Sequence, residues 1–183
     1  MIEAFRQQGD TISLSLPFSK PFDSEDATAN YILNTGDSYL VVCSYNRSIG
    51  EGANILILSF DDELSPIYKQ VNDGYDEYGT CIVRDTAENR FLLLGNRFNV
   101  QTGNSEILLH SFEINATTSP PLVKEPRLLA TESEIDTDLR AERMVRTGPG
   151  RFAIIGTRTA GDGNQNIFLQ FLENYQVADR LIF

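Results

Sequence analysis

Short apolar runs, separated by polar turn residues, recur along the whole chain. Runs such as ILIL (55–58), FLLLG (91–95), FAIIG (152–156) and IFL (167–169) lie between clusters of Gly, Asn and Asp. Short runs rich in β-branched, leucine and aromatic residues with such punctuation are typical of β-strands. No segment of the sequence shows a sustained helical period with caps at its ends. We therefore expect an all-β protein.

One octapeptide pattern occurs three times. RFLLLGNR (90–97) recurs as RFAIIGTR (151–158) and, more loosely, as SYLVVCSY (38–45). The first aromatic residues of the copies are separated by 52 and 61 residues (91 − 39 and 152 − 91). Self-similarity at a period of this size is the signature of a repeat architecture.

The segments on either side of the octapeptide repeat as well. YILNT, CIVRDT and RMVRT precede the three copies, each followed by a turn: GDS, AEN and GPG. NILILSFD, EILLHSFE and NIFLQFLE follow the copies, with Ile55, Ile107 and Ile167 at matching positions. Each unit is thus predicted to contain a strand, a tight turn, a second strand, a Gly-rich loop and a third strand.

A fourth strand is expected at the end of each unit: SPIYKQ (65–70), PPLVKEPRLL (120–129) and QVADRLIF (176–183). The second of these contains three prolines, which favour an edge position. The second and third strands of each unit are nearly continuous apolar runs, so both faces of each sheet should be covered. Four-stranded antiparallel sheets packed between copies of themselves are the blades of a β-propeller.

A small residue ends each central apolar run. Cys43, Gly95 and Gly156 occupy equivalent places in the three copies. Gly inside a strand often marks the close approach of another backbone, and Cys is the next smallest residue that remains apolar. We expect a close contact at these three positions.

The repeat resembles a known family. Its order of A-x-x-I, T-x-D-G-x-Y-x-V-x-G, a Gly-rich loop and D-I-x-L-x-x-L-D is similar to the degenerate β-propeller repeats of secreted bacterial proteins. Many of those are surface lipoproteins, notably in the Bacteroidetes. The resemblance covers residues 25–183 and implies a propeller fold and a periplasmic or cell-surface location. The chain departs from the pattern at its turns, where GDS, TAEN and GPG replace DGG, and it contains no lipobox cysteine.

The repeats divide the chain into four parts. Residues 1–24 are predicted to form a partial blade of two strands, and residues 25–76, 77–138 and 139–183 one blade-like repeat each. About three and a half blades result, whereas closed propellers have about four to eight. Three explanations stay open: the chain is a piece of a longer propeller, two copies complete one ring as a homodimer, or the fold is open or unusually small.

Charge and composition exclude several classes of function. The net charge of −11 argues against a nucleic-acid binder, which needs a basic face. No apolar run is long enough for a membrane span, and the start of the chain does not read as a signal peptide. One histidine, His110, and two cysteines cannot build a structural zinc site, so we expect no metal and no cofactor. Buried free thiols are the simplest interpretation of Cys43 and Cys81, and a disulfide between them is left open.

The loops that follow the octapeptides provide the candidate binding site. Loops of stacked repeats commonly gather on one binding rim, and Arg and aromatic residues are the usual interface anchors. Arg97 and Arg158 occupy equivalent positions, with Tyr45 as their counterpart in the first unit. We expect binding residues at Tyr45, Arg47, Arg97, Phe98 and Arg158.

Two further patterns suggest metal binding or catalysis only weakly. Asp162, Asn164 and Asn166 have the spacing of a calcium loop, but Ile167 stands where the sharp turn needs Gly. Acidic clusters precede the second and third units, at Asp73, Asp76 and Glu77, and at Glu132, Glu134, Asp136 and Asp138. We interpret the first pattern as a turn and the second as solvated linkers, so no catalytic residue is assigned.

The sequence therefore predicts a non-enzymatic binding or scaffolding module that recognises a protein or a glycan through its rim loops. The alternative is a propeller-type enzyme acting on glycans, whose site is only partly in this chain. Such an enzyme needs two carboxylates about 5–10 Å apart.

Overall fold

A computed structural model describes residues 27–36, 38–46, 52–60, 67–71, 76–118, 121–134 and 136–183. Within these ranges the chain is built from fourteen β-strands and contains no α-helix. The expected all-β class is therefore confirmed. None of the described residues belongs to a helix that could cross a membrane.

The strands form three four-stranded antiparallel sheets. The first sheet contains β1 (Ala27–Asn34), β2 (Tyr39–Asn46), β3 (Ala53–Phe60) and β4 (Ile67–Val71) in chain order. The third contains β11 (Thr137–Gly148), β12 (Arg151–Ala160), β13 (Gln165–Glu173) and β14 (Gln176–Ile182), also in chain order. The second contains β5 (Asp76–Asp85), β6 (Arg90–Asn99), β7 (Asn104–Phe112) and, at its edge, β10 (Arg127–Glu132).

The fourth strand of the second unit is shorter than expected and begins later. Only the end of residues 120–129 contributes to β10, and β9 (Leu122–Val123) pairs instead with β8 (Ile114–Asn115) as a separate two-stranded sheet. Pro126 directly precedes β10. Because proline has no backbone N–H to donate, it separates the two pairings. The edge position of this strand, expected from its prolines, is confirmed.

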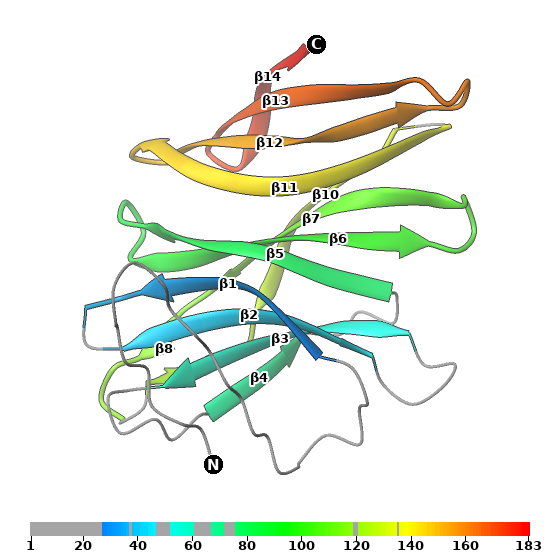
Figure 1. Ribbon diagram of the computed structural model, residues 1–183. Helices are drawn as coiled ribbons and strands as arrows, with labels where there is room; N and C mark the ends of the chain where they lie inside the picture. The colour runs from blue at the N-terminus through cyan, green and yellow to red at the C-terminus, as the bar shows by residue number, and fades with distance from the viewer. Residues whose placement is uncertain are drawn as a thin grey trace, which may run out of the picture.

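The sheets lie one above another, with the first sheet at the bottom and the third at the top of Figure 1. One apolar cluster joins the first and second sheets and includes Val42, Ile55 and Leu93. A second cluster joins the second and third sheets and includes Leu94 and Phe168. Because neighbouring residues of a strand point to opposite faces, β6 contributes to both clusters.

Two of the three positions expected to make close contacts, Gly95 and Gly156, do so. A Cβ added at Gly95 would lie 2.9 Å from the carbonyl oxygen of Tyr78 on the neighbouring strand, β5. A Cβ at Gly156 would overlap the carbonyl oxygen of Arg140 and come within 2.6 Å of the Phe168 ring. Cys43 and Cys81 are free and buried. The expected thiol state is thereby confirmed.

Candidate functional site

The first strand of each sheet carries a β-bulge at the same place. In β1 the pairing shifts between Ala29 and Tyr31, in β5 between Gly79 and Cys81, and in β11 between Ala141 and Arg143. The inserted residues are Asn30, Thr80 and Glu142. A bulge adds a residue that the ladder does not pair, and it often redirects a side chain next to a functional site. Here it turns a polar residue out of each strand.

An asparagine amide of the preceding sheet holds each of the last two bulges. Asn30 Nδ2 donates to Ser44 Oγ at 2.8 Å and to the carbonyl oxygen of Gly79 at 2.6 Å. Asn96 Nδ2 donates to the carbonyl oxygen of Ala141 at 2.9 Å, and Asn96 Oδ1 accepts from the N–H of the same residue at 2.7 Å. These bonds fix the backbone immediately before Thr80 and Glu142.

The three bulged residues line one groove across the first strands of all three sheets. Its volume is about 500 Å³, and its lining comprises Thr28, Asn30 and Ser44 of the first sheet, Tyr78, Gly79 and Thr80 of the second, and Glu142 and Arg143 of the third. Tyr78 is 45% exposed, so a ligand in the groove can contact it. The groove therefore combines residues that lie up to about a hundred positions apart in sequence.

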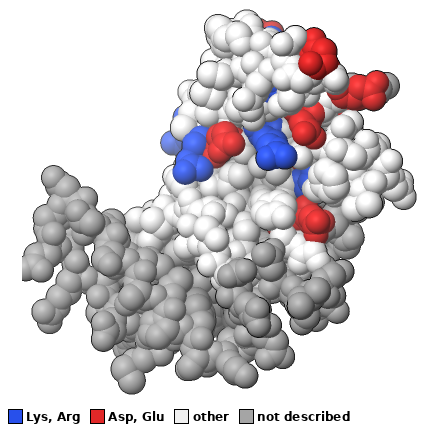
Figure 2. Space-filling model, turned by 45° about the vertical axis from the view of Figure 1, so that its right-hand side comes forward, with Lys and Arg blue, Asp and Glu red and all other residues white. Residues whose placement is uncertain are grey.

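Charge in the groove is balanced. Glu142 is the one carboxylate and Arg143 the one guanidinium among its described lining residues. Arg143 donates to the carbonyl oxygen of Glu142 at 2.7 Å, and its guanidinium lies 5.9 Å from the ring centroid of Tyr31. Thr28, Ser44 and Thr80 add hydroxyl groups, which both donate and accept hydrogen bonds. Acidic and basic side chains are also interspersed on the face seen in Figure 2.

Three of the sequence-predicted binding residues lie at equivalent register positions. Tyr45, Arg97 and Arg158 are each two residues beyond the small residue of the second strand. Tyr45 is only 4% exposed and belongs to the apolar cluster on the outer face of the first sheet. Arg97 Nε lies 2.6 Å from the buried carboxylate of Glu106. The sheets thus use Tyr45 and Arg97 within their own packing.

The remaining predicted residues differ in their surroundings. Phe98 is 38% exposed at the end of β6. Arg158 Nε lies 2.8 Å from Glu134 Oε2. Arg47 lies outside the described residues. None of the four described residues, Tyr45, Arg97, Phe98 and Arg158, lines the groove. A binding role at the rim stays a prediction.

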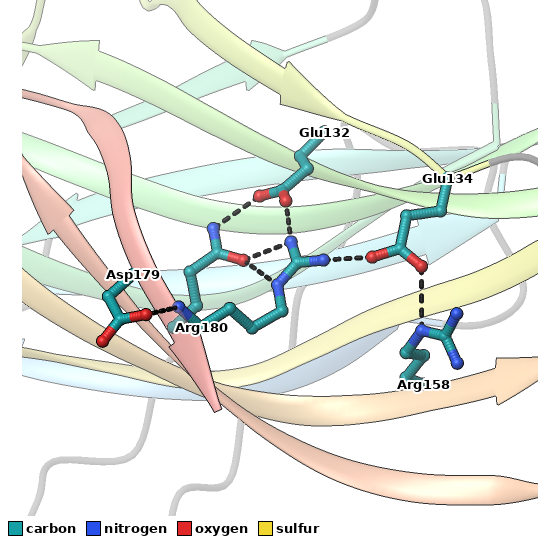
Figure 3. A network of polar contacts seen from close by, with 6 residues as sticks. Glu132, Glu134, Arg158, Asp179 and Arg180 are labelled. Atoms are coloured by element: carbon teal, nitrogen blue, oxygen red, sulfur yellow. Dashed lines mark hydrogen bonds and ion pairs between the residues drawn. The ribbon is translucent and has the colours of Figure 1, made fainter. Parts of the chain in front are cut away.

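Two of the acidic residues before the third unit, Glu132 and Glu134, are not solvated but belong to a polar network (Figure 3), whereas Asp136 is exposed. Arg180 of β14 pairs with Glu132 of β10 and with Glu134, and its Nε donates to Gln170 at 2.8 Å. Arg158 joins the network through Glu134. Burial lowers the pKa of Arg180 from its usual value. The network links an edge of the second sheet to the third.

Asp76 and Asp138 have a different structural role. The backbone N–H of Ala53 donates to Asp76 Oδ1 at 2.9 Å, and that of Ser105 donates to Asp138 Oδ1 at 2.6 Å. In both cases the first strand of one sheet accepts a bond from the start of the third strand of the sheet before it. The buried Glu77 lies beside Arg97 in the β5–β6 ladder. Asp73 lies outside the described residues.

The loop with calcium-like spacing forms a turn, as expected. Asp162 Oδ1 accepts from the backbone N–H of Asn164 at 3.0 Å, and the side-chain amide of Asn164 donates to Asp162 Oδ2 at 2.6 Å. His110 is buried in β7, at 1% exposure. In the described part of the chain no group of three or more His, Cys, Asp or Glu side chains has a metal-binding arrangement.

The groove does not follow from the sequence patterns described above, although the sequence carries one signal of it. Alternation of inward and outward residues breaks at the same place in each first strand, where a polar residue directly follows Ala29, Gly79 and Ala141.

Comparison with protein-family models, with curated proteins and with solved structures gives no match for this chain.

Proposed function

We propose that this protein is a non-catalytic binding module with propeller-type sheets, and that the groove between its three bulges holds a glycan. The observation that carries the proposal is the convergence of Asn30, Thr80 and Glu142 with an exposed tyrosine on one groove. Bulges are common next to functional sites.

The chemistry of the lining favours an uncharged polar ligand. One carboxylate and one guanidinium balance each other, and the chain as a whole is acidic. Sugar hydroxyls both donate and accept hydrogen bonds, which matches the threonine and serine hydroxyls together with Glu142 and Arg143. The tyrosine ring adds an apolar surface with a polar tip.

The architecture and location remain part of this proposal. Three stacked four-stranded sheets with equivalent inter-sheet contacts support a propeller-type repeat. The resemblance to secreted bacterial repeats supports a periplasmic or cell-surface location. The alternative ligand for the same binding function is a protein that contacts the rim residues.

A matched pair of aromatic variants tests the site. Tyr78 and Phe98 lie on neighbouring strands and are exposed to a similar degree, 45% and 38%, but only Tyr78 lines the groove. On an array of immobilised neutral oligosaccharides we expect wild-type binding, a loss of at least tenfold in affinity for Tyr78→Ala, and unchanged affinity for Phe98→Ala.

The opposite result would move the site. Loss of binding with Phe98→Ala and not with Tyr78→Ala would assign the ligand to the rim. Absence of binding to every oligosaccharide, with binding to a peptide array that depends on Tyr78, would replace the glycan with a protein ligand. Shortening of the bound oligosaccharide, abolished by Glu142→Gln, would support the glycan-active enzyme instead.

A further inference from the structure

The centre of the outer face of the third sheet is apolar and exposed, between the polar pairs Arg151–Glu173 and Thr159–Gln165. Five rows of cross-strand neighbours cross this face, and the central row runs from Arg143 at its edge through Ile155 and Leu169 to Leu181. Val145 and Ile167 lie in the rows on either side of it. Val145, Ile155, Ile167 and Leu181 are between 44% and 57% exposed. Contiguous apolar patches of this kind on a soluble protein mark interaction surfaces.

Repeat equivalence shows that these positions are covered elsewhere in the molecule. Ile55 and Ile107, the counterparts of Ile167, are 0% and 3% exposed because the following sheet packs on them. Val42 and Leu94, which occupy the place of Ile155 in the first two units, are both 0% exposed. The third sheet therefore carries the residues of an inter-sheet contact on a face that remains open.

The opposite end of the stack is closed. On the outer face of the first sheet, Val41, Cys43, Leu56 and Leu58 are all at most 3% exposed. Among the four-stranded sheet faces of the described residues, the outer face of the third sheet is thus the one that is open. When each chain has one open face, two copies cover both open faces only if they join through that same face.

The size of the face suits a dimer. β12 has ten residues. At about 3.3 Å per residue and about 4.8 Å per strand, the four strands cover roughly 19 by 33 Å, or about 600 Å² on each copy with the polar ends of the face included. Two copies would bury about 1,200 Å² in total, which reaches the lower end of stable protein–protein interfaces.

We infer that the outer face of the third sheet is the contact surface of a two-fold symmetric dimer of this chain, packed sheet on sheet. The inference does not depend on the proposed function. Most of the groove lies away from this face, because six of its eight lining residues belong to the first and second sheets; Arg143 pairs with Ile155 at the edge of the face.

Light scattering after size exclusion tests the dimer. We expect a mass near 41 kDa (2 × 20.5 kDa) for the wild type, falling toward 20.5 kDa on dilution. Ile167→Glu would place a charge in the dry interface and should weaken the dimer at least 100-fold. Val100→Glu is the matched control, because Val100 is 74% exposed in the turn between β6 and β7.

A folding check accompanies the variants. Ile167 points away from the core of one chain, so Ile167→Glu should keep the wild-type far-UV circular dichroism spectrum and melting temperature when both proteins are monomeric. Ile155→Lys provides a second substitution on the same face with the same expected result.

Two results would overturn the inference. The first is a dimer that Ile167→Glu weakens no more than Val100→Glu does. The second is a mass of 20.5 kDa at every concentration.

Discussion

Glycine at position 156 is required because the adjacent strand and the third sheet's own core approach its α-carbon from two directions. A methyl group there would overlap the carbonyl oxygen of Arg140 and the Phe168 ring. Gly148, on the neighbouring strand β11, has its nearest neighbours at 3.7 Å, which is ordinary van der Waals contact. The two glycines differ in their surroundings, so they form a matched pair.

Substitution by alanine should separate them. Gly156→Ala is expected to lower the free energy of unfolding by about 1–3 kcal/mol, the usual effect of overpacking a core. Gly148→Ala should be neutral or stabilise by up to about 1 kcal/mol, because alanine reduces the entropy of the unfolded chain. Urea titration followed by circular dichroism measures both. Equal losses for the two variants would contradict the close approach at Gly156.

The two thiols should be unreactive in the folded protein. Burial raises the pKa of Cys43 from 9.0 to about 12 and also raises that of Cys81. The thiolate is the reactive form, so a disulfide reagent at pH 8 should label neither residue until the protein is unfolded with denaturant. Rapid labelling of Cys43 in the native protein would show that its site opens.

The same pKa shifts give a direction for stability against pH. The folded chain keeps these thiols protonated where the unfolded chain ionises them. Their contribution to stability is therefore complete below pH 9 and declines as the pH rises from 9 toward 12. Cys43→Ala should flatten this decline in the free energy of unfolding, although it also removes buried volume.

At the scale of elements, the sheets are joined by backbone-directed polar contacts as well as by apolar packing. Asn96 provides two hydrogen bonds across one interface, to the N–H and the carbonyl oxygen of Ala141. Thr157 occupies the equivalent position on the third sheet, where no further sheet of the described chain packs. The side chain at this register position should therefore affect the free energy of unfolding only where another sheet packs on it.

Replacing Asn96 tests this contact. Asn96→Ala leaves two backbone groups at the interface without their partner, and a cost of about 1–3 kcal/mol is expected. Thr157→Ala should change the free energy of unfolding by less than about 0.5 kcal/mol, as for most surface substitutions. Chemical denaturation of both variants at low protein concentration gives the comparison. A similar cost for both would remove the special role of Asn96.

A strand can be predicted from the sequence when its own run of residues shows that it is a strand. The apolar runs around Phe91 and Phe152 each form a central strand, because a continuous apolar run can be buried on both faces of a sheet. The boundary at Pro126 was missed, since pairing partners far along the chain decide which half of residues 120–129 joins the sheet. The groove was missed for the same reason: the bulge at Glu142 has meaning only once Asn30 and Thr80 lie beside it.

At the scale of the whole molecule, the described residues form a stack in which the second sheet supports both others. Leu93 and Leu94 are adjacent in β6 and both fully buried, but Leu93 belongs to the cluster with the first sheet and Leu94 to the cluster with the third. Repeat stacks derive their stability from such nearest-neighbour interfaces. Substitutions at adjacent positions of β6 can therefore weaken the two interfaces separately.

Truncating each leucine should weaken one interface more than the other. Leu93→Ala and Leu94→Ala should each cost about 2–5 kcal/mol, because each leaves a cavity in a packed core. Amide hydrogen exchange should lose protection mainly in β2 and β3 for Leu93→Ala, and mainly in β12 and β13 for Leu94→Ala. Equal loss throughout both outer sheets in both variants would show that the stack unfolds as one cooperative unit. Loss of protection confined to the first sheet for Leu93→Ala and to the third sheet for Leu94→Ala is the expected result. It would mean that the two interfaces of the second sheet open independently, as expected for a linear repeat.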